Sequence, residues 1–173
     1  MLFKHEEPIL AENVVLSQLY THVGTLSFSN LRHLETRRTP TADMLIALIS
    51  STHQLGVLVV EFDNQRVGIE VLTKLSNPST CLLPQLIQLY LPLSTVADPA
   101  SFRPELSQFI EARAQGSWKR LERLGLPKHR DIVNANFAES LASYNIEINF
   151  GFRSRIPAPE LEFGVYGLRP QTT

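Results

Sequence analysis

The feature that most constrains the fold is an apolar, β-branched segment at residues 56–72. Four apolar residues at 57–60 lead into the polar pair Asn64 and Gln65, and valine or isoleucine then recurs at every second position. β-Branched runs on both sides of a short polar turn are typical of a β-hairpin. We therefore expect residues 57–72 to form an antiparallel hairpin that turns at Asn64 and Gln65.

A second alternating segment lies near the C-terminus. Apolar residues alternate with polar residues and glycine from Tyr144 to Phe152, and a matching run follows from Leu161 to Val165. Alternation with a period of two is the pattern of a half-buried strand. The two runs predict a second antiparallel hairpin, over residues 144–166.

Helical spacing of apolar residues occurs in four other segments. It predicts helices over residues 9–23, from Thr41 to Gly56, over residues 104–124 and over residues 128–143. Thr41 suits the first position of its helix because its hydroxyl can accept a hydrogen bond from a free N–H group of the first turn. The expected fold class is α+β, an antiparallel sheet built from two β-hairpins and packed against about four helices.

The length of 173 residues is suited to one domain, so we expect residues 1–173 to fold as a single unit with one core. Prolines interrupt a connection at about residues 76–103, which we expect to be irregular. No repeat of fixed period is found along the chain.

The charge is nearly balanced, with 16 Lys and Arg against 17 Asp and Glu, so no overall field draws the chain to nucleic acid or to an anionic membrane. Cys81 is the single cysteine and cannot form an internal disulfide. No apolar run is long enough to span a bilayer, and the first ten residues do not resemble a secretory signal. These features predict a cytoplasmic protein with no membrane span.

No motif predicts a cofactor or a metal, and we expect none. The sequence contains neither the serine-hydrolase motif nor a phosphate-binding loop. The histidines are far apart in the sequence, and no pair has the four-residue spacing of a helical metal site; they are His5, His22, His33, His53 and His129.

Paired carboxylates are the remaining feature that could indicate catalysis. The expected hairpins place Glu61 near Glu70 and Glu147 near Glu162, and each pair is better explained as part of a solvated sheet face. No catalytic residue is assigned. A small enzyme that uses Glu61, Glu70 or a histidine as acid or base is the third functional hypothesis.

A basic segment at residues 113–130 supports the second hypothesis, a nucleic-acid-binding module. Its cations could contact phosphates; they are Arg113, Lys119, Arg120, Arg123, Lys128 and Arg130. Trp118 could stack on a base, but it shares a helical spacing with Leu121 and Leu124, which favours a place in the core.

The leading hypothesis is a non-enzymatic protein–protein interaction subunit or adaptor of a homo- or hetero-oligomeric assembly. Charged residues are 19% of the chain against about 25% in an average domain, so apolar surface is left over for a partner. The proposed surface lies between residues 82 and 93 and consists of Leu82, Leu86, Ile87, Leu89, Tyr90 and Leu93. The alternative is that the same segment is a lid closing the open side of the sheet.

Overall fold

The sheet is parallel throughout in the computed structural model, which describes residues 12–16, 28, 30–39, 41–80, 82–92, 98–126, 135–150 and 161–163. Its seven strands within these residues follow the order β6-β5-β4-β3-β2-β1-β7, and all pairs are parallel. The strands are β1 (Asn13–Leu16), β2 (His33–Thr39), β3 (Val57–Phe62), β4 (Gln88–Tyr90), β5 (Arg123–Leu126), β6 (Glu147–Phe150) and β7 (Leu161–Phe163). The helices are α1 (Ala42–Ser50), α2 (Gln65–Ser76), the 3-10 helix η2 (Pro99–Phe102), α3 (Arg103–Gln115) and α4 (Ala135–Ser143). The protein thus has an α/β fold, and the expected α+β fold with an antiparallel sheet is wrong.

The first expected hairpin is a strand followed by a helix. Residues 57–62 form β3 as expected, but Asn64 begins α2 instead of a turn, because its side-chain oxygen accepts a hydrogen bond from the N–H of Val67 at 3.1 Å. The apolar residues after Asn64 fit a helical period as well as an alternating one. The buried ones are Val67, Val71, Leu72 and Leu75, and these form the inner face of α2.

The second expected hairpin is also wrong. Its two strands exist as β6 and β7, but they lie at opposite edges of the sheet, β6 beside β5 and β7 beside β1. Alternation shows that a segment is half-buried in a sheet and does not identify its neighbour. Both segments therefore form strands as predicted, but the predicted pairing of one strand with the other is wrong.

The helix expected from Thr41 to Gly56 is confirmed in its first part as α1, which ends at Ser50, and Thr41 caps it by accepting from the N–H of Met44. The helix expected at residues 104–124 ends at Gln115, and the residues from Arg123 on form β5. The helix expected at residues 9–23 is wrong at residues 13–16, which form β1. The rest of that segment lies outside the described residues. Within residues 128–143, α4 occupies Ala135–Ser143, and residues 128–134 are outside them.

Leucines at matching positions define a repeat of unequal length. The repeat consists of a leucine, a second leucine three residues later, and an apolar residue or threonine two positions after that. It occurs four times, starting at Leu31, Leu55, Leu86 and Leu121. The second leucines are Leu34, Leu58, Leu89 and Leu124, and all eight leucines are at most 3% exposed. The starting positions are separated by 24, 31 and 35 residues, so a search for a fixed period does not detect them.

The same repeat carries a ladder of backbone hydrogen bonds. The carbonyl of Arg32, which follows the first leucine, accepts from the N–H groups of Gly56 and Val57 at 2.9 and 3.0 Å. A carbonyl has two lone pairs and can accept both bonds. Equivalent pairs run from Arg32 and His33 to Glu12, from Ile87 and Gln88 to Gly56, and from Glu122 and Arg123 to Ile87. Each strand is thereby placed in the same register as the strand before it.

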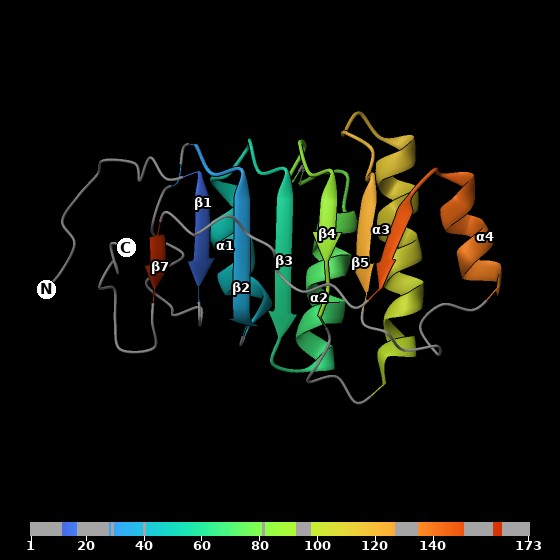
Figure 1. The fold of residues 1–173 in the computed structure, drawn as a ribbon, viewed down its shortest axis with the longest axis horizontal. Coiled ribbons are helices and arrows are strands. Elements are labelled where there is room, and N and C mark those ends of the chain that lie inside the picture. The colour runs from blue at the N-terminus through green and yellow to red at the C-terminus, as the bar shows by residue number, and fades with distance from the viewer. Residues whose placement is uncertain are drawn as a thin grey trace, which may run out of the picture.

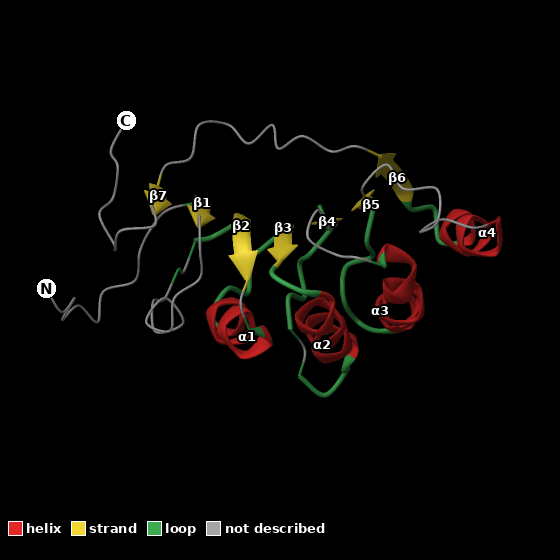
Figure 2. Cartoon of the chain, turned by 90° about the horizontal axis from the view of Figure 1, so that it is seen from below, coloured by secondary structure: helices red, strands yellow, loops and turns green. Residues whose placement is uncertain are grey.

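Three of the four described crossover helices, α1, α2 and α3, cover the same face of the sheet. Figures 1 and 2 show α1, α2 and α3 side by side on one side of it, while α4 lies beyond β6 at the end of the row. The strands from β1 to β6 follow one another in sequence order, so the chain advances by one strand at each crossover. The core lies between this helical layer and the leucine side of the sheet.

A close contact between α2 and η2 shows how tightly the layers meet. The rings of Phe62 and Phe102 are stacked with their centres 6.2 Å apart, and Gly68 of α2 lies against both. A Cβ atom at Gly68 would be 2.3 Å from the Phe102 ring, which is shorter than any real contact. Only glycine therefore fits at this position of α2.

The inward position of Leu58 is testable by comparison with its neighbour Val57. Leu58 is fully buried on the helix side, whereas Val57 is half-buried on the other side. We expect Leu58→Ala to lower the free energy of unfolding in urea by about 2–5 kcal/mol, because it leaves a cavity. Val57→Ala should cost about 1 kcal/mol. Equal losses of unfolding free energy would show that Leu58 and Val57 are assigned to the wrong faces of the sheet.

Candidate functional site

The face of the sheet opposite α1, α2 and α3 is concave, and we call it the concave face. Adjacent strands are about 4.8 Å apart, whereas packed helices are about 8–10 Å apart. A sheet with all its crossover helices on one side must therefore curve away from them. Figure 2 shows the strands in an arc that opens on the side without these helices.

Strand register arranges the side chains of the concave face in two rows. Alternation directs the second leucine of each repeat toward the helices and the residues on either side of it toward the concave face. The first row consists of Asn13, His33, Val57, Gln88, Arg123 and Glu147. The second row consists of Val15, Glu35, Val59, Tyr90, Gly125 and Asn149. The first row is half-buried to exposed, whereas four members of the second row are at most 5% exposed.

A polar cluster occupies the concave face at β4, β5 and β6. The Tyr90 hydroxyl donates to the Gln88 side-chain oxygen at 3.0 Å. The Arg123 Nε donates to the Glu147 carboxylate at 2.9 Å, and this ion pair is half exposed to solvent. Burial raises the pKa of the Tyr90 phenol, and the nearby Arg123 cation opposes that rise. The cluster offers donors and acceptors in fixed positions.

Gly125 allows Tyr90 to lie flat on the sheet. A Cβ atom at Gly125 would be 1.9 Å from the Tyr90 ring, so the ring occupies the space where a side chain of β5 would stand. Tyr90 and Gly125 are register neighbours on β4 and β5. The ring is thereby held in place on the concave face beside the Arg123–Glu147 pair.

A second polar group lies on β2. The carboxylate of Glu35 is buried and accepts from Arg37 Nε at 3.2 Å. His33 lies two residues before Glu35 on the same face of β2 and has a buried Nε2 atom. Burial lowers the pKa of its imidazole, although the Glu35 charge opposes the shift. The neutral form of His33 is therefore favoured in the folded protein.

The segment predicted as a partner surface is mostly part of the core. Leu82, Leu86 and Leu89 are buried, since β4 lies in the middle of the sheet with helices covering its leucine side. For the same reason the segment is not a lid on the sheet. Ile87 is half-buried, Tyr90 faces the concave side, and Leu93 lies outside the described residues.

The predicted basic patch also combines a buried residue with exposed ones. Arg113 is 1% exposed, and its guanidinium donates to the carbonyls of Leu83, Leu86 and Lys119 at 3.2, 2.8 and 2.8 Å. It lies 5.6 Å from the ring centres of Phe109 and Trp118, and Trp118 is buried. Of the other cations, Lys119, Arg120 and Arg123 are exposed, while Lys128 and Arg130 lie outside the described residues.

The predicted carboxylate pairs are not formed. Glu61 is on β3, whereas Glu70 is on α2, where it pairs with Lys74 at 3.0 Å. Glu147 and Glu162 lie on strands at opposite edges of the sheet. His33 and His53 are far apart in the chain, and His5, His22 and His129 lie outside the described residues. Within the part of the chain that the structure describes, no three histidine, cysteine or acidic side chains are grouped to hold a metal.

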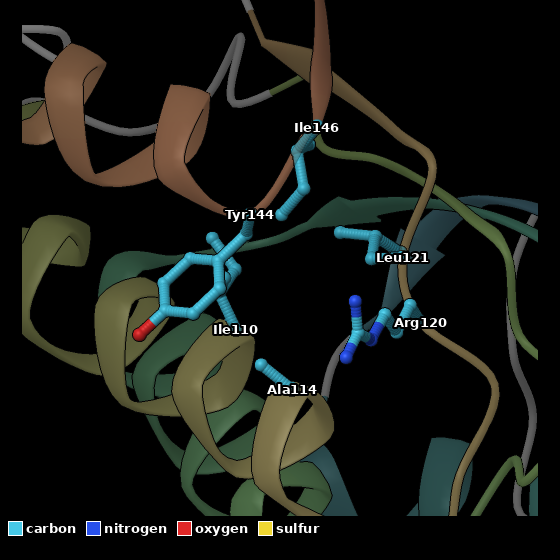
Figure 3. A pocket seen from close by; sticks show the side chains of 6 residues that line it. All are labelled: Ile110, Ala114, Arg120, Leu121, Tyr144 and Ile146. Atoms are coloured by element: carbon cyan, nitrogen blue, oxygen red, sulfur yellow. The ribbon is translucent and has the colours of Figure 1, made fainter.

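A small hollow lies between α3 and the end of α4, lined by Ile110, Ala114, Arg120, Leu121, Tyr144 and Ile146. Figure 3 shows the Tyr144 ring beside Ile110 with its hydroxyl directed outward. The volume is about 10 Å³, which is room for about one water molecule. This hollow is too small to be a ligand site.

Comparisons with models of known families, with curated proteins and with solved structures find no match to this chain. Among the described residues, no helix combines the length and the apolar character needed to cross a bilayer.

The structural role of Arg113 predicts a large difference between two arginine variants. Arg113→Met removes the donors of three carbonyl groups in a buried region, so we expect the free energy of unfolding to fall by about 3–5 kcal/mol. Arg120→Met, at an exposed position three residues before β5 begins, should change it by about 0.5 kcal/mol or less. Urea unfolding followed by circular dichroism measures both. Similar values for the two variants would contradict the buried role of Arg113.

The lowered pKa of His33 predicts a dependence of stability on pH. The unfolded chain takes up a proton near pH 6.5, the ordinary value for histidine, whereas folded His33 resists protonation until the pH is lower. The free energy of unfolding should therefore fall as the pH drops from about 7 to about 5. His33→Gln should reduce that fall in urea titrations. An unchanged pH profile in the variant would assign the effect to other groups.

Proposed function

We propose that this chain is a non-enzymatic protein-binding module, an adaptor that binds its partner on the concave face. The observation that carries the proposal is the arrangement of the sheet: six successive parallel strands present one continuous row of side chains on the side without crossover helices. Serial αβ repeats with the spacing of leucines seen here resemble leucine-rich repeats. Solenoids of that kind bind partners on their concave surface.

The chemistry of the first row fits a protein partner. Gln88 supplies an amide, and Arg123 with Glu147 supplies both signs of charge in one half-exposed pair. Arginine is enriched among residues that dominate binding energy at interfaces, and Arg123 is exposed beside the buried Tyr90. A mixed row of this kind suits hydrogen bonds to a peptide chain better than it suits a uniformly charged ligand.

The size of the row sets a requirement on the partner. A standard interface buries about 800 Å² on each side and involves about 20–30 residues. The first row holds six side chains within the described residues, and most of the second row is buried. A stable complex therefore also needs contacts with loops at the ends of the strands. With one cysteine in the sequence, we assign the module to the reducing cytoplasm.

The basic segment supports nucleic-acid binding less well than the concave face supports protein binding. Arg113 is used inside the core, and Arg123 is paired with a carboxylate. An electrostatic track needs several cations free to contact phosphates. Steep weakening of partner binding between 50 and about 200 mM salt would favour nucleic acid.

The test compares two matched pairs of exposed side chains on opposite sides of the protein. The double variant Arg123→Ala and Glu147→Ala removes the ion pair of the concave face without changing the net charge. The control, Glu111→Ala and Gln115→Ala, removes an exposed hydrogen-bonded pair on α3. Both double variants should unfold within about 1 kcal/mol of the native chain, because the pairs are exposed.

A partner that co-purifies with the chain from its native source is then produced in pure form and titrated by calorimetry. We expect at least a tenfold loss of affinity for the concave-face variant and less than a twofold change for the α3 variant, each at 150 mM salt. A loss confined to the α3 variant would place the interface on the helical side and would overturn the proposal.

A further inference from the structure

A pocket of about 140 Å³ lies at the edge of the sheet where the strands begin, separate from the concave face. Its wall is formed by the end of α1, the turn after it, and the segment that leads from α2 to β4. The lining residues are Ile49, Ser50, Thr52, His53, Thr80, Leu82, Leu83 and Pro84, and the wall is mainly polar. A volume of about 10–15 Å³ on this scale holds one water molecule, so the pocket has room for a small ligand of several non-hydrogen atoms.

The three hydroxyl groups in this wall have already donated their protons. Ser50 Oγ donates to the Ile46 carbonyl at 2.6 Å, and Thr52 Oγ1 donates to the Ile49 carbonyl at 2.9 Å. Thr80 Oγ1 donates to the carbonyl of Asn77 at 2.9 Å. A hydroxyl has one proton and two acceptor lone pairs. With their protons engaged in these bonds, the three oxygens can serve a ligand as hydrogen-bond acceptors.

The backbone around the pocket adds negative potential. Ile49 and Ser50 belong to the last turn of α1, where the helix dipole places its negative end. That turn contains no basic side chain to balance it. Acceptors together with a negative helix end favour a ligand that carries several N–H donors and a positive charge.

The far wall of the pocket is held rigidly. Leu83 has a φ of 52°, in the left-handed region that leucine rarely adopts. Its carbonyl accepts from buried Arg113 and from the N–H of Leu86, which keeps the backbone in this conformation. A rigid wall lowers the entropy cost of binding a small group.

We propose that this pocket binds a primary ammonium group, presented either by a lysine side chain of a protein partner or by a small free amine. An ammonium group has three N–H donors, which matches the number of hydroxyl oxygens in the wall. With three methylene groups behind it, the ligand fits within the available volume. The inference does not rest on the function proposed for the concave face.

The first experiment titrates the full ¹⁵N-labelled chain with n-butylammonium chloride, using n-butanol and sodium chloride as references. We expect saturable shifts of the amide signals of Thr52, His53 and Thr80, with a Kd on the order of 1–10 mM for this five-atom ligand. n-Butanol has the same chain length but no charge and should give no saturable shift. Equal responses to the two compounds would overturn the proposal.

A matched pair of variants tests the role of the hydroxyl groups. Thr80→Val removes one acceptor at an exposed position and should weaken n-butylammonium binding at least fivefold. Thr73→Val is the control, because Thr73 is also exposed and also donates to a backbone carbonyl, that of Ile69 at 2.9 Å, but lies outside the pocket. Ser50→Ala supplies a second pocket variant if Thr80→Val alters the fold. Unchanged binding in both pocket variants would overturn the proposal.

A final comparison separates the two sources of the ammonium group. A short peptide with a central lysine and the same peptide with norleucine are titrated under identical conditions. Binding of the lysine peptide at least tenfold tighter than n-butylammonium assigns the site to a partner's lysine, and equal affinities assign it to a free amine. Equal binding of the lysine and norleucine peptides would contradict an ammonium site.

Discussion

The organisation of this protein depends on one repeated backbone interaction. The carbonyls of Glu12, Arg32, Gly56 and Ile87 each accept two consecutive N–H groups at or just before the start of the next strand. Because side chains alternate along a strand, a slip of one residue would move a leucine such as Leu58 from the core to the concave face. The ladder thus keeps the leucines inside and the polar rows outside at every strand.

The position of α1, α2 and α3 on one face follows from this register and shapes the rest of the surface. The leucines of the repeats are covered by α1, α2 and α3, so the opposite face is left for polar side chains. The different spacings of helices and strands then curve the sheet. The concave face and the ammonium pocket lie on different parts of this framework, so the two proposals can succeed or fail independently.

Arg113 connects the helical layer to the strands. It extends from the last turn of α3 to carbonyls that precede β4 and β5, and it is enclosed by Phe109 and Trp118. Full burial of a cation is costly unless it is well hydrogen-bonded, and three carbonyl acceptors meet part of that need. The sequence suggested Arg113 as a phosphate contact. In the structure it instead holds two loops in position, one of which forms a wall of the pocket.

The sequence by itself determined local features whose physical cause is local. Thr41 begins a helix because its hydroxyl caps the first turn, and residues 57–62 and 147–150 form strands because their side chains favour extended backbone. It also contained the leucine repeat, although unequal spacing concealed it. Tertiary structure decided the features that a local sequence pattern does not specify, such as the type of an element and the neighbour of a strand. Asn64 begins a helix instead of a turn because Val67, Val71 and Leu75 can bury one helical face against the sheet, and β6 and β7 lie at opposite edges because alternation does not specify a partner. The concave face and the pocket exist only where strands and helices distant in sequence meet, since register and packing, which single segments do not encode, bring their side chains together.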